Sequence, residues 1–129
     1  MVPKYRAYDG GSLNRMYQPD EVMVGNGDIW IIDEDSVAGE WIVNNDIHLM
    51  QSTGLLDKNC KEIFEGDIVD YKGRKAVIKW HGSYASFIYI FVDELQKRVA
   101  GWSPLYLAYF HFEVIGNKFE TPEFLEVEE

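Results

Sequence analysis

Short apolar segments, separated by turn residues, follow one another along the chain. In the first half they cover residues 5–8, 22–24, 29–32 and 41–43, and each ends near a cluster of Gly, Asn, Asp or Glu. Short strands with a turn signal after each one are typical of all-β domains. Nowhere do apolar residues hold a helical period over a length that would support an amphipathic helix. The pattern therefore predicts a mainly β protein with few or no long helices.

The central stretch, residues 49–71, is dense in turn residues. Thr53-Gly54 predicts a turn. Asp57-Lys58-Asn59 places side chains where they can accept hydrogen bonds from nearby backbone amides, and such residues tolerate left-handed geometry. Gly66 is free to take a positive φ in a second tight turn. Its neighbour Asp67 is interpreted as a turn-stabilising acceptor, and a strand at 68–71 follows.

The second half continues as strands and tight turns. Residues 75–80 are expected to pair back on 68–71 through Lys72-Gly73-Arg74. Residues 87–92 are apolar in both alternating sets, which predicts a strand covered on both faces. Residues 110–115 are expected to form the final strand. In it, His111 would point away from the face that carries Phe110 and Phe112.

A short helical turn is predicted at 122–125, with Thr121 as its cap and Pro122 at its first position. The strands of the second half, opened by Glu65-Gly66-Asp67, resemble an SH3-like small β-barrel. The predicted organisation is an N-terminal β subdomain at 1–50 and an SH3-like barrel subdomain at 51–129 with an acidic C-terminal tail.

The formal net charge is −10. This charge disfavours simple binding to nucleic acid, which needs Lys and Arg against phosphate, and it also disfavours attachment to an anionic membrane. Part of it lies in the tail, which is interpreted as a solubilising terminus, with DNA mimicry or a basic partner as alternatives. The tail carboxylates are Glu120, Glu123, Glu126, Glu128 and Glu129.

Cysteine usage and hydropathy indicate a protein of a reducing, intracellular compartment that does not span a membrane. The one cysteine, Cys60, cannot form an intramolecular disulfide. No signal peptide is expected, and no apolar run approaches the length of a transmembrane helix. We expect a cytoplasmic protein.

No motif predicts a metal, a cofactor or catalysis. His48, His81 and His111 lack the paired spacing of zinc ligands. Cys60 lacks a neighbouring base and is interpreted as a turn thiol. Asp33-Glu34-Asp35 lacks the ligand spacing of a calcium loop and is interpreted as a solvated turn. Asp67 with Asp70 is the one candidate pair for acid–base chemistry, with the structural role of Asp67 preferred. We predict that the protein is not an enzyme.

An aromatic set interleaved with basic residues is the strongest candidate for a binding surface. Three interpretations stay open: core and edge-strand protection, which is preferred, a peptide or protein groove of the SH3 type, and a single-strand nucleic-acid platform. The candidate surface residues are Tyr71, Lys72, Arg74, Lys75, Lys79, Trp80, Tyr84, Tyr89 and Trp102. Phe87 and Phe91 belong to the same aromatic set.

Three separated motifs resemble the YopX family of prophage and phage proteins. They are the opening at 4–9 with Met16, the central signature at 49–59 and 62–69, and the closing motif at 113–117 with Glu120 and 122–125. The chain departs from the family pattern at Cys60, where glycine is common, and at Thr121, where asparagine is common. The change at Cys60 questions a positive φ there. The resemblance implies a mainly β phage-encoded accessory protein with no established activity.

From these observations we predict an accessory protein that binds another protein or itself. A nucleic-acid-associated small β-barrel regulator is the alternative. No cofactor and no membrane partner is expected.

Overall fold

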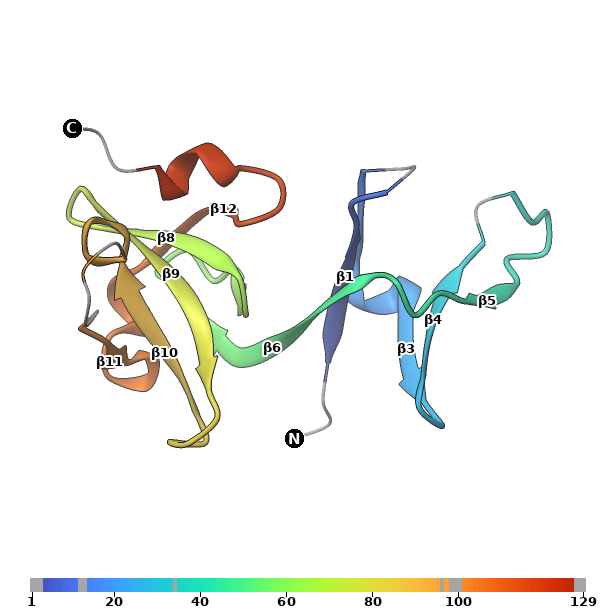
Figure 1. Ribbon diagram of the computed structural model, residues 1–129, viewed down its shortest axis with the longest axis horizontal. Coiled ribbons are helices and arrows are strands. Elements are labelled where there is room, and N and C mark those ends of the chain that lie inside the picture. Colours follow the sequence, from blue (N-terminus) through green and yellow to red (C-terminus); the bar gives the residue numbers. More distant parts are fainter. Residues whose placement is uncertain (1–3, 12–13, 34, 96, 98–100, 127–129) are drawn as a thin grey trace. The chain divides into compact units, whose positions relative to one another are not determined.

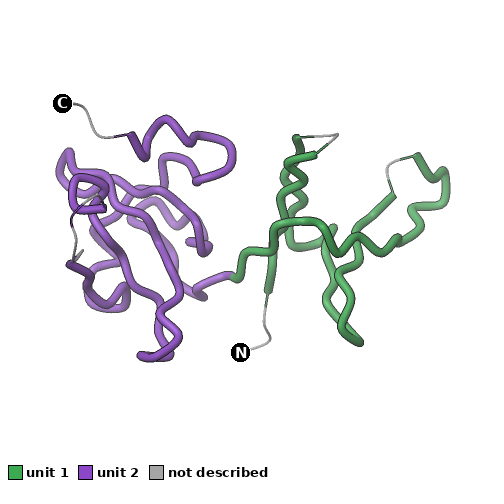
Figure 2. The backbone as a smooth tube through the Cα atoms, viewed as in Figure 1, with its two compact units in different colours: residues 1–51 green, residues 52–129 purple. Residues whose placement is uncertain are grey.

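The computed structural model of the chain describes residues 4–11, 14–33, 35–95, 97 and 101–126. It divides into two compact units, residues 1–51 and 52–129 (Figure 2). Some residues named above lie outside the described part, namely Glu34, Glu128 and Glu129.

The prediction of a mainly β fold is confirmed (Figure 1). The strands are β1 (Tyr5–Asp9), β2 (Arg15–Tyr17), β3 (Val22–Gly25), β4 (Asp28–Ile32), β5 (Trp41–Val43), β6 (His48–Leu56), β7 (Glu62–Phe64), β8 (Asp67–Tyr71), β9 (Arg74–His81), β10 (Ser86–Phe91), β11 (Ser103–Pro104) and β12 (Glu113–Asn117). Helical structure among the described residues is limited to short 3-10 segments, which are η1 (Pro19–Glu21), η2 (Val92–Glu94), η3 (Leu105–Leu107), η4 (Tyr109–His111) and η5 (Pro122–Leu125).

Unit 1 is built from hairpins. β1 pairs with β2 and with the first part of β6, while β3, β4 and β5 form a separate antiparallel sheet in that order. The β3–β4 turn uses Asn26 at φ +53° and Gly27 at φ +80°, a geometry that suits a tight hairpin. The core of the unit gathers around Ala7, Tyr17 and Ile31.

The predicted turn at Thr53-Gly54 is wrong, because both residues lie within β6. Gly54 takes φ +77°, and the pairing of β6 with β7 is irregular between Ser52 and Leu56. Glycine here serves a bulge within a strand rather than a chain reversal.

Unit 2 contains a curled half-barrel sheet with the order β11-β10-β9-β8-β12 (Figure 1). The predicted β8–β9 hairpin is confirmed, with Lys72 at φ +51° and Gly73 at φ +87° in its turn. Gly66 takes φ +87°, as its turn was predicted to require. Asp67 is buried, and its Oδ2 accepts a 2.8 Å hydrogen bond from the Phe64 amide, which confirms its structural role.

Both faces of this sheet are covered, as the doubly apolar pattern of β10 predicts. One face carries a buried cluster around Ile63, Ile78 and Phe112, against which the aromatic side chains of β10 pack. The opposite face carries Val77, Ile88 and Ile90. Tyr89 stands opposite Ile78 on the first face and Ile90 stands opposite Val77 on the second, so the β9–β10 pair supplies side chains to both layers.

The predicted final strand at 110–115 begins too early. Residues 109–111 form η4, and the Phe112 amide donates to the Tyr109 carbonyl within that turn instead of to a ladder. Phe110 is therefore exposed, whereas Phe112 is fully buried. Alternation of aromatic residues does not separate a 3-10 turn from a strand over so short a run.

The C-terminal turn forms as predicted, with Pro122 at its first position, but Thr121 does not cap it. The Thr121 hydroxyl instead donates to the Asn117 carbonyl and accepts from the Asn117 amide, at 2.9 and 3.0 Å. This hydroxyl therefore closes the loop that follows β12.

Candidate functional site

The predicted surface residues do not form one site, because they occupy three places in unit 2. The sheet interior holds Tyr71 and Tyr89. The end of the sheet at the β8–β9 turn holds Lys72, Arg74 and Lys75. The residues at or toward the β9–β10 turn are Lys79, Trp80, Tyr84 and Trp102.

Tyr71 and Tyr89 are core-packing residues. Both are half-buried against the cluster around Phe112, with edge-to-face ring centroids 5.6 and 4.9 Å from that ring. Such pairs add to the stability that burial of their area provides. For these two aromatics the core interpretation holds.

The cations near the β8–β9 turn are engaged with neighbouring side chains. Arg74 forms a salt bridge with Asp93 at 2.9 Å, and its guanidinium carbon lies 3.6 Å from the centre of the Phe91 ring. The hydrogen bond to Asp93 raises the pKa of Arg74, which is fully charged in any case. Lys75 lies over the Phe124 ring at 5.2 Å. Arg74, Lys75, Asp93 and Glu126 line a pocket of about 240 Å³ with balanced charge.

The β9–β10 turn carries exposed aromatic rings. His81, Tyr84 and Trp102 contact one another, with ring centroids 4.8 Å apart for His81–Trp102, 5.0 Å for Tyr84–Trp102 and 6.1 Å for His81–Tyr84. We call these three residues the aromatic cluster. The Tyr84 amide donates to His81 Nδ1 at 3.2 Å, which fixes the start of the turn. Tyr84 is 58% exposed and Trp102 is 37% exposed.

Trp80 lies nearby but is not part of the aromatic cluster. It is 46% exposed and makes an edge-to-face contact with Phe87 at 5.0 Å across the β9–β10 pair. Ala76 and Ile78, which share its face of the strand, are fully buried. Trp80 thus lies on the core face of β9, at a position that the described residues leave partly exposed.

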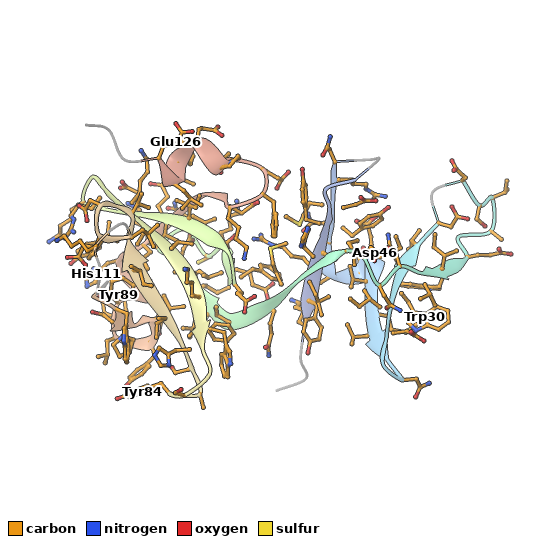
Figure 3. All side chains as sticks on the ribbon, viewed as in Figure 1. Trp30, Asp46, Tyr84, Tyr89, His111 and Glu126 are labelled. Atoms are coloured by element: carbon orange, nitrogen blue, oxygen red, sulfur yellow. The ribbon has the colours of Figure 1, made fainter. Side chains whose placement is uncertain are left out.

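The basic residues and the aromatic cluster lie at opposite ends of β9. Arg74 opens this strand and His81 closes it, a span of about 23 Å at the rise of an extended strand. In Figure 3, Tyr84 marks the aromatic end, and Glu126, which lines the pocket with Arg74 and Lys75, lies at the far end. Of the four basic residues in the predicted surface, Lys79 alone lies near the end of β9 that carries the aromatic cluster.

His81 is the site residue that sequence reasoning did not include. It was weighed only as a metal ligand, because a histidine that ends a strand gives no pattern of its own. Its place directly before Gly82-Ser83, two residues that favour turns, was the available signal, since side chains on either side of a tight turn meet.

The other candidates are placed as local structural residues. Cys60 is exposed in a turn at φ +63°, and its amide donates to the Asp57 carbonyl at 3.0 Å. Asp67 and Asp70 are three apart on β8 and point to opposite faces, so they do not form an acid–base pair. His111 is exposed beside Tyr71, with ring centroids 5.7 Å apart. His48 lies on β6, in unit 1.

Within the described ranges, no group of three His, Cys, Asp or Glu side chains is arranged to hold a metal ion. The same residues include no helix that is both long and apolar enough to cross a membrane.

Fold and site together define a two-unit, mainly β protein with an exposed aromatic cluster. The chain belongs to the YopX family, because the family model described as "YopX protein" matches residues 4–126. No curated protein matches the chain.

Among solved structures, the chain is similar to protein EF1440 from Enterococcus faecalis. The two share 28% sequence identity with a TM-score of 0.60, over 98% of this chain and 99% of that one. The likeness therefore extends over both units.

Proposed function

We propose that this protein is a phage or prophage accessory protein of the bacterial cytoplasm that acts by binding another protein, not by catalysis. The binding element is the aromatic cluster at the β9–β10 turn of unit 2, which we interpret as a small SH3-like barrel. The phage role rests on the family resemblance of the three sequence motifs.

The mutual packing of His81, Tyr84 and Trp102 in an exposed position carries the proposal. Tyrosine and tryptophan dominate the residues that supply binding energy at protein interfaces. They offer a large apolar area with few rotatable bonds, and here ring contacts hold them before a partner arrives. A partner thus meets a preordered surface.

The chemistry of the cluster fits an extended, proline-containing segment of a partner protein. Aromatic-lined surfaces on SH3 domains bind such segments, because a preformed polyproline helix loses little entropy on binding. The exposed aromatic side chains of Tyr84 and Trp102 suit an apolar ligand. Nucleic acid is the weaker candidate, because Arg74 is paired with Asp93 at the opposite end of β9.

The test compares Tyr84→Ala with Tyr106→Ala. Both tyrosines are in unit 2 and are 58% and 57% exposed, but only Tyr84 belongs to the aromatic cluster. Immobilised wild-type protein and the two variants would capture partners from host lysate with and without nuclease treatment, with quantitative mass spectrometry as the readout. We expect one set of proteins to be retained by the wild type and by Tyr106→Ala, and to be lost with Tyr84→Ala. Loss of a central aromatic contact weakens binding by roughly thirtyfold.

Two results would contradict the proposal. Equal capture by both variants would place binding elsewhere. Loss of all partners on nuclease treatment would favour the nucleic-acid-associated barrel. Light scattering after size exclusion distinguishes self-association, since a dimer that Tyr84→Ala dissociates would make a second copy the partner.

A further inference from the structure

The edge strand β5 of unit 1 is open on one side. In the order β3-β4-β5 it pairs with β4 alone among the described residues, whereas β3, at the other edge, also contacts β1 and η1. β5 reads Trp41-Ile42-Val43, and all three side chains are exposed. Edge strands of soluble proteins are ordinarily protected by lysine, proline or a bulge, and β5 has none of these.

The hydrogen-bond alternation shows which backbone groups of β5 face outward. The Asn44 amide donates to the Ile29 carbonyl and the Asp33 amide donates to the Glu40 carbonyl, both at 2.8 Å. Residues 40, 42 and 44 therefore bond toward β4, because antiparallel ladders alternate along the strand. The amides and carbonyls of Trp41 and Val43 point away from the sheet and can receive another strand.

Acidic residues surround the same edge. Ile42 and Asn44 line a pocket of about 240 Å³ together with Tyr17, Ile31, Ile32 and the carboxylates of Asp9, Asp33 and Asp35. Asp9 Oδ1 accepts from the Gly11 amide and Asp33 Oδ1 accepts from the Asp35 amide. Among the described residues, no hydrogen bond reaches the second oxygen of either carboxylate. The pocket holds several water volumes, since one water takes about 30 Å³, so a long side chain fits it.

We propose that β5 binds an extended, basic segment of a partner protein by strand addition. The added strand bonds to the amides and carbonyls of Trp41 and Val43. A lysine or arginine opposite Ile42 lays its aliphatic stem over that side chain and directs its charge to Asp9, Asp33 and Asp35. The flanking apolar side chains of the segment lie beside Trp41 and Val43, so the recognised pattern is apolar–basic–apolar.

Charge selects this partner over a second copy. Residues 1–51 contain nine acidic and three basic side chains, a net charge of −6. Antiparallel pairing of two β5 strands about Ile42 would place Glu40 of one copy beside Asn44 of the other, at the pocket already lined by three carboxylates. The Glu40 carboxylate of one copy would then approach the acidic pocket of the other, and repulsion between these like charges opposes self-pairing. A cationic side chain is attracted to the same pocket.

The test uses two short synthetic peptides, Ser-Val-Lys-Val-Ser and Ser-Val-Glu-Val-Ser, added to the whole protein. Binding is followed by amide chemical shifts and hydrogen exchange in ¹⁵N-labelled protein. We expect the lysine peptide to shift and protect the Trp41 and Val43 amides, and the glutamate peptide to leave them unchanged.

Three variants sharpen the result. Asp33→Asn removes charge while it keeps the acceptor for the Asp35 amide, and should weaken binding of the lysine peptide roughly fivefold. Asp46→Asn removes an exposed carboxylate of the same unit that does not line the pocket, and should leave affinity unchanged. Val43→Pro deletes an outward amide that makes no bond to β4, and should abolish binding.

Several outcomes would overturn the proposal. These are equal binding of both peptides, equal effects of Asp33→Asn and Asp46→Asn, and protection that omits Trp41 and Val43. A dimer of the unliganded protein that Val43→Pro dissociates would assign the edge to a second copy. Asp33→Asn keeps the test decisive even if Val43→Pro does not fold.

Discussion

Asp57 is a buried carboxylate that holds together three parts of the backbone. Its Oδ1 accepts from the Asn59 and Lys61 amides and its Oδ2 accepts from the Val114 amide, all at 2.8 Å. Replacement by alanine leaves three donors unpaired in a protected position. We expect Asp57→Ala to lower the free energy of unfolding by about 3 kcal/mol, measured by urea denaturation.

Asp70→Ala is the matched control in the same unit. Asp70 is half-buried and accepts a single long bond of 3.4 Å from the Gly73 amide, so its loss should cost less than about 1 kcal/mol. Equal losses for the two variants would show that the Asp57 network contributes little beyond an ordinary turn contact.

Local turn chemistry was readable at single residues, whereas distant partners were not. The acceptor role of Asp57 toward Asn59 follows from the side chain and its place in a turn. Its bond to Val114 joins residues 57 positions apart, and no local pattern encodes that contact. At Cys60 the sequence was misleading in another way. A residue other than glycine argues against a positive φ, yet Cys60 takes φ +63°. Its amide bond to the Asp57 carbonyl closes the turn despite the cost of that geometry.

At the scale of elements, β12 depends on a glycine within its bulge. The register with β8 shifts between Val114 and Gly116, and a Cβ at Gly116 would fall far inside contact distance of the Thr121 hydroxyl. That hydroxyl bonds to both backbone groups of Asn117, so it cannot move without breaking the loop. We expect Gly116→Ala to lower the free energy of unfolding by about 2 kcal/mol, measured by thermal and urea denaturation.

Gly82→Ala provides the comparison. No atom lies within 4 Å of a Cβ at Gly82, so the change should alter stability by no more than about 0.5 kcal/mol. Comparable losses at both glycines would mean that the contact with Thr121 does not account for the effect, because the lower unfolded-chain entropy of alanine favours folding at both positions.

The β8–β9 hairpin was predictable because its turn and its alternation are local. The start of β12 was not, because the bond from the Phe112 amide to the Tyr109 carbonyl replaces a ladder bond without changing the aromatic pattern. The candidate surface divided for a similar reason. Trp80 and buried Ile78 lie on the same face of β9. Trp80 is exposed because the side chains that cover Ile78 do not extend as far as Trp80.

At the scale of the whole molecule, the two units carry surfaces of different chemistry. Unit 1 is strongly acidic around an open strand edge, whereas unit 2 presents aromatic rings at a hairpin turn. An acidic chain of this kind selects against nonspecific contact with nucleic acid and favours encounter with basic partners. Composition revealed the net charge, but only the fold shows that Asp9, Asp33 and Asp35 line one pocket together with Ile42.

The two surfaces should bind independently, because they share no residue and belong to different units. We expect Tyr84→Ala to leave the affinity for the lysine peptide unchanged, and Asp33→Asn to leave capture through the aromatic cluster unchanged. Effects of changes at separate sites without shared partners add within about 0.5 kcal/mol. The double variant should therefore bind the lysine peptide as Asp33→Asn does and capture partners as Tyr84→Ala does. Titration of the lysine peptide into wild type, single and double variants checks the first part, and quantitative capture in the presence of saturating peptide checks the second. A change in either affinity on filling the other surface would contradict independent binding and would show that the two sites are coupled.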